Sequence, residues 1–107
     1  MSPSRPFTLI FAPELVQHVA TIERKYHILI RQTIREQLRD TPNIPTKNRK
    51  PLEQPAPFGA TWELRFGPNN RFRVFYEINQ EQHQVEILAI GTKEGNRLYI
   101  GGEEYTR

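Results

Sequence analysis

Residues 62–78, WELRFGPNNRFRVFYEI, decide the fold because they alternate in polarity as two strands joined by a turn would. Side chains along a strand point to opposite faces with a period of two. Residues 67–70 between the two arms are Gly, Pro, Asn and Asn, which favour turns because of the backbone angles they adopt. The stretch therefore predicts a β-hairpin whose apolar face joins a core: Trp62, Leu64, Phe66, Phe72, Val74, Tyr76 and Ile78.

The opposite face of the predicted hairpin concentrates arginine. It carries Arg65, Arg71 and Arg73 together with one aromatic residue and two carboxylates: Phe75, Glu63 and Glu77. For any single arginine, the simpler interpretation is the charged solvent face of a half-buried sheet. Surfaces that serve only solubility usually intersperse their charges, so the set as a whole indicates an anion-binding surface.

Composition limits the possible functions. A chain of 107 residues fits a single domain, residues 1–107, that buries a core without metal or disulfide support. It has no cysteine, so disulfides, a thiolate nucleophile and a Cys-based zinc site are excluded. No apolar run is long enough to span a membrane and MSPSRPF lacks the apolar core of a signal peptide, so we expect a cytoplasmic protein. The net charge of +3 and pI of about 9.5 permit an anionic partner.

The rest of the chain predicts an α+β domain. Residues 7–11 suit an N-terminal strand, and residues 13–40 carry apolar side chains at helical spacing. The pattern does not separate one long helix from two, although a compact domain favours two. Residues 41–60 contain five of the nine prolines and are predicted to be an irregular, basic surface loop. Residues 84–91 read as a third strand after the hairpin, and residues 92–107 as a C-terminal tail.

This order of elements, with WELRFGPNNRFRVFYEI followed by VEILAIGTKEGNRLY, resembles the RelE/ParE superfamily of bacterial toxins from type II toxin-antitoxin pairs. The resemblance spans residues 7–100. It implies a RelE-like fold, in which an N-terminal strand and an α-hairpin pack on a twisted antiparallel sheet of about four strands. Members of the RelE branch cut messenger RNA in the ribosomal A site, whereas members of the ParE branch poison DNA gyrase.

The resemblance also implies catalytic residues if the chain is a nuclease. Arg73 matches the family arginine that lies against the phosphate, and Arg65 stands where a RelE-like lysine lies. Glu63 replaces a second such lysine by a carboxylate and is a candidate general base. Lys93 follows the third strand, and Tyr99 matches the family tyrosine near the C-terminus if the tail aligns without a gap.

Six further residues are candidate nucleic-acid contacts, each with a simpler structural explanation: Arg71, Lys47, Arg49, Lys50, Arg97 and Phe75. The arginines on the strands could pair with nearby glutamates, and the loop cations could serve solubility. Phe75 could stack on an unpaired base or be covered by another segment. The three histidines are expected to be packed or solvated residues, and neither a metal nor an organic cofactor is expected.

The leading hypothesis from sequence is therefore a toxin that acts as a metal-independent, ribosome-dependent endoribonuclease and represses translation. Its expected partners are a cognate antitoxin, the ribosome and mRNA. One alternative is a ParE-like inhibitor of DNA gyrase without nuclease activity, and another is a degenerate member that only binds its antitoxin. Clustering of Arg65, Arg73, Lys93 and Tyr99 in one concave patch would favour the nuclease, and their dispersal would favour the alternatives.

Overall fold

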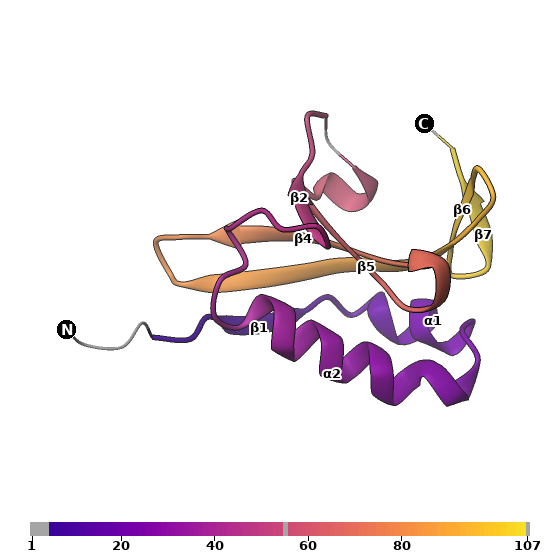
Figure 1. The fold of residues 1–107 in the computed structure, drawn as a ribbon, viewed down its shortest axis with the longest axis horizontal. Coiled ribbons are helices and arrows are strands. Elements are labelled where there is room, and N and C mark those ends of the chain that lie inside the picture. Colours follow the sequence, from indigo (N-terminus) through magenta and orange to yellow (C-terminus); the bar gives the residue numbers. More distant parts are fainter. Residues whose placement is uncertain (1–4, 55, 107) are drawn as a thin grey trace.

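The computed structural model describes residues 5–54 and 56–106, which form one layer of helices against one twisted sheet (Figure 1). The helical layer consists of α1 (Leu15–Ala20), the short 3-10 helix η1 (Arg24–Tyr26) and α2 (His27–Leu38), and two further 3-10 helices lie in connections, η2 (Pro57–Gly59) and η3 (Pro68–Asn70). The strands are β1 (Thr8–Phe11), β2 (Arg49–Pro51), β3 (Trp62–Phe66), β4 (Phe72–Asn79), β5 (Gln84–Glu94), β6 (Arg97–Ile100) and β7 (Glu103–Tyr105). The α+β class and the helix-on-sheet arrangement predicted from the sequence are confirmed.

The predicted hairpin forms as β3 and β4, with Trp62 opposite Tyr76 and Phe66 opposite Phe72. The turn requires left-handed backbone at Gly67, Asn69 and Asn70, whose φ angles are 84°, 55° and 52°. Gly67 is also sterically required, because a Cβ atom there would lie 2.4 Å from the Phe72 ring. Glycine and asparagine at these positions therefore fix the register of the hairpin.

The helical region contains two helices, as a compact domain favours. α1 ends at Ala20, and the chain turns through η1 before α2 begins at His27. Figure 1 shows α1 and α2 together on one side of the sheet. Their buried side chains pack on the apolar face of the hairpin in the main core: Leu15, Ile22, Ile30, Ile34 and Leu38 meet Leu64, Phe66, Phe72, Val74, Tyr76, Val85 and Ile87.

The sheet has seven strands in the described residues, more than the four or so that were predicted. β5 is long enough to pair twice along one edge. It pairs in parallel with β1 at residues 84–87 and antiparallel with β6 at residues 91–94. The sheet is therefore mixed rather than purely antiparallel, because β1 runs parallel to its partner β5.

Two segments expected to be irregular contain strands. β2 lies inside residues 41–60 and pairs with β3, so the prediction that proline excludes regular structure there was wrong. Pro51 is tolerated because β2 is an edge strand, where a missing N–H breaks no ladder. The predicted tail, residues 92–107, continues β5 and then forms the β6–β7 hairpin, seen at the C-terminal end of the chain in Figure 1.

A second, smaller core lies on the arginine face of the sheet. Phe75 and Ala89 from the sheet pack there with Ala56 and Ala60 of the proline-rich loop and with Ile100 of β6. The hydroxyl of buried Tyr76 donates to the Pro42 carbonyl oxygen at 2.9 Å and so also holds this loop. The proline-rich loop and β6 therefore cover part of the arginine face, which is not fully open to solvent. Among the described residues, no helix has the length and apolar character that crossing a membrane would require.

Candidate anion-binding site

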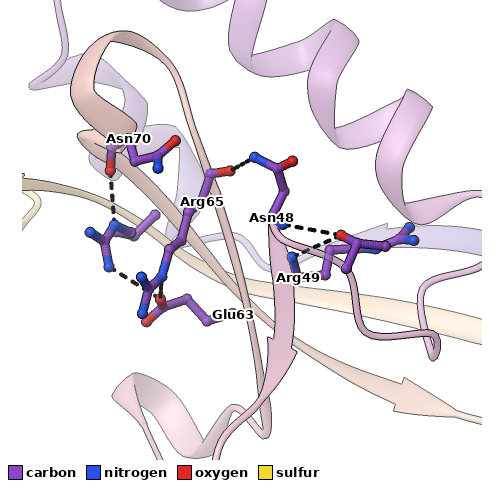
Figure 2. Close-up of polar contacts among 7 residues, drawn as sticks. Asn48, Arg49, Glu63, Arg65 and Asn70 are labelled. Carbon is purple, nitrogen blue, oxygen red and sulfur yellow. Dashed lines mark hydrogen bonds and ion pairs between the residues drawn. The ribbon is translucent and has the colours of Figure 1, made fainter.

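A carboxylate lies between two arginines at the centre of the arginine face. Arg65 on β3 pairs directly opposite Arg73 on β4. Glu63 Oε1 accepts from Arg65 Nε at 2.6 Å and from Arg73 Nη1 at 3.1 Å. Figure 2 shows Glu63 and Arg65 in this arrangement, with Asn70 of the hairpin turn beside them. Because like charges directly opposite one another repel, Glu63 is the counterion that allows the two arginines to coexist.

Arg73 is held in a fixed orientation. Its Nε donates to the Asn70 carbonyl oxygen at 3.0 Å, so the guanidinium is hydrogen-bonded both to the hairpin turn and to Glu63. Burial lowers the pKa of Arg73 below its usual value, while Glu63 raises it and Arg65 lowers it further. An arginine side chain carries five N–H donors. These contacts use Nε and Nη1 and leave further donors of Arg73 for an anionic ligand.

Two neighbouring cavities meet at Arg73. The first, of about 300 Å³, is lined by Glu63, Arg73, Lys93, Arg97 and Tyr105 among others. The second, of about 450 Å³, is lined by Pro68, Asn69, Arg71, Arg73, Lys93 and Gly95. We call the first the Glu63 cavity, because Glu63 lines it and does not line the second. It brings a carboxylate, several cations and a phenol together. Such a set can bind a phosphate and move protons around it.

The predicted tyrosine, Tyr99, does not line this cavity. In β6, Leu98 and Ile100 lie over Gly91, on the arginine face of the sheet. Side chains alternate along a strand, so Tyr99 points to the opposite face. Tyr105 pairs with Leu98 and lies on the arginine face, where it lines the Glu63 cavity. The structure thus brings Glu63, Arg73 and Lys93 together with Tyr105, which was not predicted. Arg65 contacts Glu63 but does not line the cavity, so the predicted patch of Arg65, Arg73, Lys93 and Tyr99 forms only in part.

The basic residues of the proline-rich loop do not form one patch. Arg49 is only 6% exposed, and its guanidinium donates to the Gln37 carbonyl oxygen and to Thr41 Oγ1. It therefore ties β2 to the end of α2 and is not placed to contact nucleic acid. Lys47 and Lys50 are exposed, and Lys50 lies opposite Glu63 in the β2–β3 ladder.

The remaining predicted contacts have protein partners. Phe75 is 3% exposed within the second core, so it is not placed to stack on a base. Arg71 lies over the Tyr26 and Phe72 rings, with its guanidinium 4.0 Å from Glu23. Arg97 lies 4.0 Å from Glu104, and both line the Glu63 cavity. Both ion pairs are long and partly exposed, so they constrain the arginines weakly.

The histidines are packed residues, as the sequence suggested. His27 Nε2 contacts the Ile22 carbonyl oxygen at 2.8 Å, and the His83 ring stacks on Phe7. His18 is buried, and its Nδ1 accepts from the Ile90 amide at 3.3 Å. In residues 5–54 and 56–106, no three His, Asp or Glu side chains gather as metal ligands would.

His18 is expected to make the fold sensitive to mild acid. Burial lowers its pKa below the ordinary value of about 6.5, and Glu14 opposes that shift more weakly. The unfolded chain therefore binds a proton at higher pH than the folded one, and stability is lost as pH falls below about 6.5. We expect the melting temperature to fall by a few degrees between pH 7.5 and 5.5. His18→Gln, which keeps an acceptor for the Ile90 amide, should reduce that fall. Equal pH slopes for both proteins would show that His18 is not the cause.

The comparisons with known proteins agree with this architecture. The family model described as the ParE toxin of the type II toxin-antitoxin system, parDE, matches residues 9–97. Among solved structures, the chain is similar to one in the crystal structure of the toxin-antitoxin complex RelBE2 from Mycobacterium tuberculosis. That likeness has a TM-score of 0.64 and 20% identity over 83% of this chain and 93% of the other. No match is found among curated proteins.

The fold is therefore that of a small toxin domain. Because the family model covers most of the chain, the protein belongs to the ParE toxin family of type II toxin-antitoxin systems and to the RelE/ParE superfamily. The structural likeness, at 20% identity, establishes the fold alone.

Proposed function

We propose that this toxin is an endoribonuclease that cleaves messenger RNA on the ribosome. The observation that supports the proposal is the Glu63 cavity, in which Glu63, Arg73, Lys93, Arg97 and Tyr105 converge. An inhibitor that acts only by binding a protein needs no such set of groups. Internal cleavage of RNA needs a proton acceptor, cations around the phosphate and a donor for the leaving oxygen.

The reaction is an internal transesterification in this proposal. The ribose 2′ oxygen attacks the adjacent phosphorus, the bond from phosphorus to the 5′ oxygen breaks, and a 2′,3′-cyclic phosphate and a 5′ hydroxyl result. Both arginine hydrogen bonds to Glu63 end on Oε1, so Oε2 is the atom we assign to accept the 2′-hydroxyl proton. Arg73 and Lys93 stabilise the charge on the phosphate, and Tyr105 gives its proton to the departing 5′ oxygen.

The two C-terminal tyrosines provide a matched test. Tyr105→Phe is expected to slow message cleavage about 100-fold, the lower end of what a positioned proton donor contributes. Tyr99→Phe is expected to leave the rate within a factor of about two, because Tyr99 lies on the other face of β6. The measurement is the rate of cleavage of a translated message in a purified translation system. A larger loss in Tyr99→Phe than in Tyr105→Phe would overturn the assignment.

Inhibition of DNA gyrase is the second candidate function, and the name of the matching family is the observation that favours it. The Glu63 carboxylate also neutralises part of the charge on Arg65 and Arg73. A surface that binds a protein does not need the full positive charge of both arginines, so this ion pairing is compatible with gyrase inhibition. Under this alternative, Tyr105→Phe would leave toxicity unchanged. Gyrase would be trapped on DNA while translated messages stay intact.

We also propose a cognate antitoxin as the partner, since the similar solved structure is that of a toxin-antitoxin complex. An apolar groove of about 300 Å³ runs between β1 and the helices and suits this role. Its lining is aliphatic and aromatic with two basic residues: Phe11, Leu15, Val19, Ile30 and Ile34 with Arg31 and Arg35. Phe11 is 51% exposed there. An amphipathic antitoxin helix with acidic flanks would match both the apolar lining and the arginines.

A further inference from the structure

The second cavity on the arginine face differs in charge from the Glu63 cavity. It has a volume of about 450 Å³, and the described residues that line it include three cations and no carboxylate: Arg71, Arg73 and Lys93 with Pro68, Asn69 and Gly95. The Glu63 cavity, in contrast, is lined by two carboxylates, Glu63 and Glu104. We call the second cavity the Arg71 cavity, because Arg71 lines it and does not line the first.

Two cations of the Arg71 cavity face one another across the sheet. The Lys93 amide donates to the Arg71 carbonyl oxygen at 2.7 Å, which continues the β4–β5 register and puts Arg71 directly opposite Lys93. Like charges in such positions repel. The other opposed pair on this face, Arg65 and Arg73, has Glu63 as its shared counterion. No carboxylate that lines the Arg71 cavity serves Arg71 and Lys93 in this way, so an anion from solution can take that place.

Aromatic contacts position the Arg71 guanidinium without neutralising it. Its Cζ lies 5.6 Å from the Tyr26 ring centroid and 5.3 Å from that of Phe72. The ion pair with Glu23 is 4.0 Å long and the Glu23 side chain is 60% exposed, so this pair is weak. Glu23 is also shared with Lys25, at 3.6 Å. An anion entering the cavity therefore meets an arginine that keeps its charge and is already oriented, which reduces the entropy lost on binding.

We propose that the Arg71 cavity binds a phosphate dianion, held by Arg71, Lys93 and the free donors of Arg73. Arginine and lysine are the side chains that proteins use for phosphate. Three cations without a carboxylate match two negative charges better than the single charge of an internal RNA phosphate. The ligand is therefore inorganic phosphate or the terminal phosphate of a nucleotide.

Occupancy of the Arg71 cavity has a consequence for cleavage that rests on the proposed function. Arg73 and Lys93 line both cavities. In the proposed reaction these two cations stabilise the phosphate of the message. A dianion in the Arg71 cavity therefore competes with the message for both cations and inhibits the toxin.

The test is titration of the full chain with inorganic phosphate at pH 8 and constant ionic strength, followed through backbone amide NMR signals. The signals of Lys93 and Gly95 are expected to shift, and dimethyl phosphate, which carries one charge, should bind about tenfold more weakly. No shift at these amides, or equal affinity for dimethyl phosphate, would overturn the proposal. Adenosine 5′-monophosphate distinguishes the two sources. Tighter binding than that of inorganic phosphate would assign the cavity to a nucleotide, and equal or weaker binding would assign it to inorganic phosphate.

Variants locate the binding in this cavity. Arg71→Gln removes the cation that lines only this cavity and is expected to weaken phosphate binding about tenfold, whereas Arg71→Lys should keep most of the affinity. Lys93→Gln, at an exposed position, tests the opposite wall and should lose a similar amount. The matched control is Arg35→Gln, which removes an exposed arginine from α2 and should bind as the wild type does. Equal weakening in Arg35→Gln, or full affinity in Arg71→Gln, would overturn the site.

A second readout separates this proposal from the nuclease itself. On purified ribosome–message complexes at constant free Mg²⁺, phosphate should raise the KM of cleavage and leave kcat unchanged. Arg71→Gln should need about tenfold more phosphate to halve its own uninhibited rate. If messages stay intact while phosphate still shifts the Lys93 and Gly95 amides, the proposed nuclease fails and the phosphate site stands. If messages are cut and phosphate shifts neither amide, the nuclease stands and the phosphate site fails.

Discussion

Replacing Arg73 with alanine is expected to lower the rate of message cleavage about 100- to 1,000-fold. Losses of this size follow when one preorganised donor to a developing charge is removed. Arg73 is oriented by both Glu63 and Asn70, so its guanidinium is fixed before substrate arrives. The effect should appear mainly in kcat, because charge on the phosphate oxygens grows in the transition state.

The matched control is Arg24→Ala, which removes one exposed arginine from η1 in the helical layer. It changes the net charge by the same amount and should leave cleavage unchanged. Single-turnover cleavage of a translated message measures both variants. A similar loss in the two would mean that overall charge, rather than the position of Arg73, governs the activity. Full activity of Arg73→Ala would remove Arg73 from the reaction.

Replacing Glu63 with alanine is expected to destabilise the fold by about 3 kcal/mol. The substitution leaves Arg65 and Arg73 opposite one another without their shared counterion, and Arg73 is only 9% exposed. Removal of one partner of a buried ion pair lowers the free energy of unfolding by about this amount. Denaturant unfolding measures the loss, which should shift the midpoint without a change in slope.

Glu77→Ala is the control for this prediction, because Glu77 is an exposed carboxylate on the same strand, β4. It should change stability by less than about 0.5 kcal/mol. In addition, Glu63→Ala with Arg73→Leu should recover part of the stability, since the second change removes the unpaired buried cation. A Glu63→Ala variant as stable as Glu77→Ala would show that the arginines do not need this counterion.

Much of the fold could be predicted because the polarity pattern and the turn residues of the sequence favour the same hairpin that packs in the core. The period-two pattern of residues 62–78 has the turn chemistry that its register requires, with asparagine and glycine where φ is positive. The strands that were missed lack such a pattern. β2 is three residues long and includes Pro51, so only its pairing with β3 defines it. β1 itself was predicted, but its parallel pairing with β5 joins distant parts of the chain, which no local pattern encodes.

The site could be predicted only where its residues lie in regular strands. Alternation along β3 and β4 correctly groups Glu63, Arg65 and Arg73 on one face. Alignment of the tail selected Tyr99, whereas the β6–β7 hairpin puts Tyr105 in the cavity. The apolar residues Leu98 and Ile100 on either side of Tyr99 were an available signal, because they indicate that the tyrosine points away from their face.

For Arg49 and Phe75, the sequence suggested contacts with nucleic acid, but burial of these side chains could not be predicted from local patterns. A cation in a proline-rich loop and an aromatic among arginines both suggest contact with nucleic acid. Arg49 is instead buried against the end of α2, and Phe75 is covered by Ala56 and Ala60 of the same loop. Both outcomes depend on how the loop folds back over the sheet, which is set by tertiary contacts such as that from Tyr76 to Pro42.

The most direct test of the central claim is the chemistry of RNA ends after induction of the toxin in a bacterium without the antitoxin. For the wild type, we expect new 5′-hydroxyl and 2′,3′-cyclic phosphate ends inside translated reading frames, and their loss in a Tyr105→Phe, Arg73→Ala double variant. Gyrase activity and DNA supercoiling are measured in the same cells. Intact messages together with gyrase-linked DNA breaks would show that the protein is a gyrase inhibitor and not a nuclease.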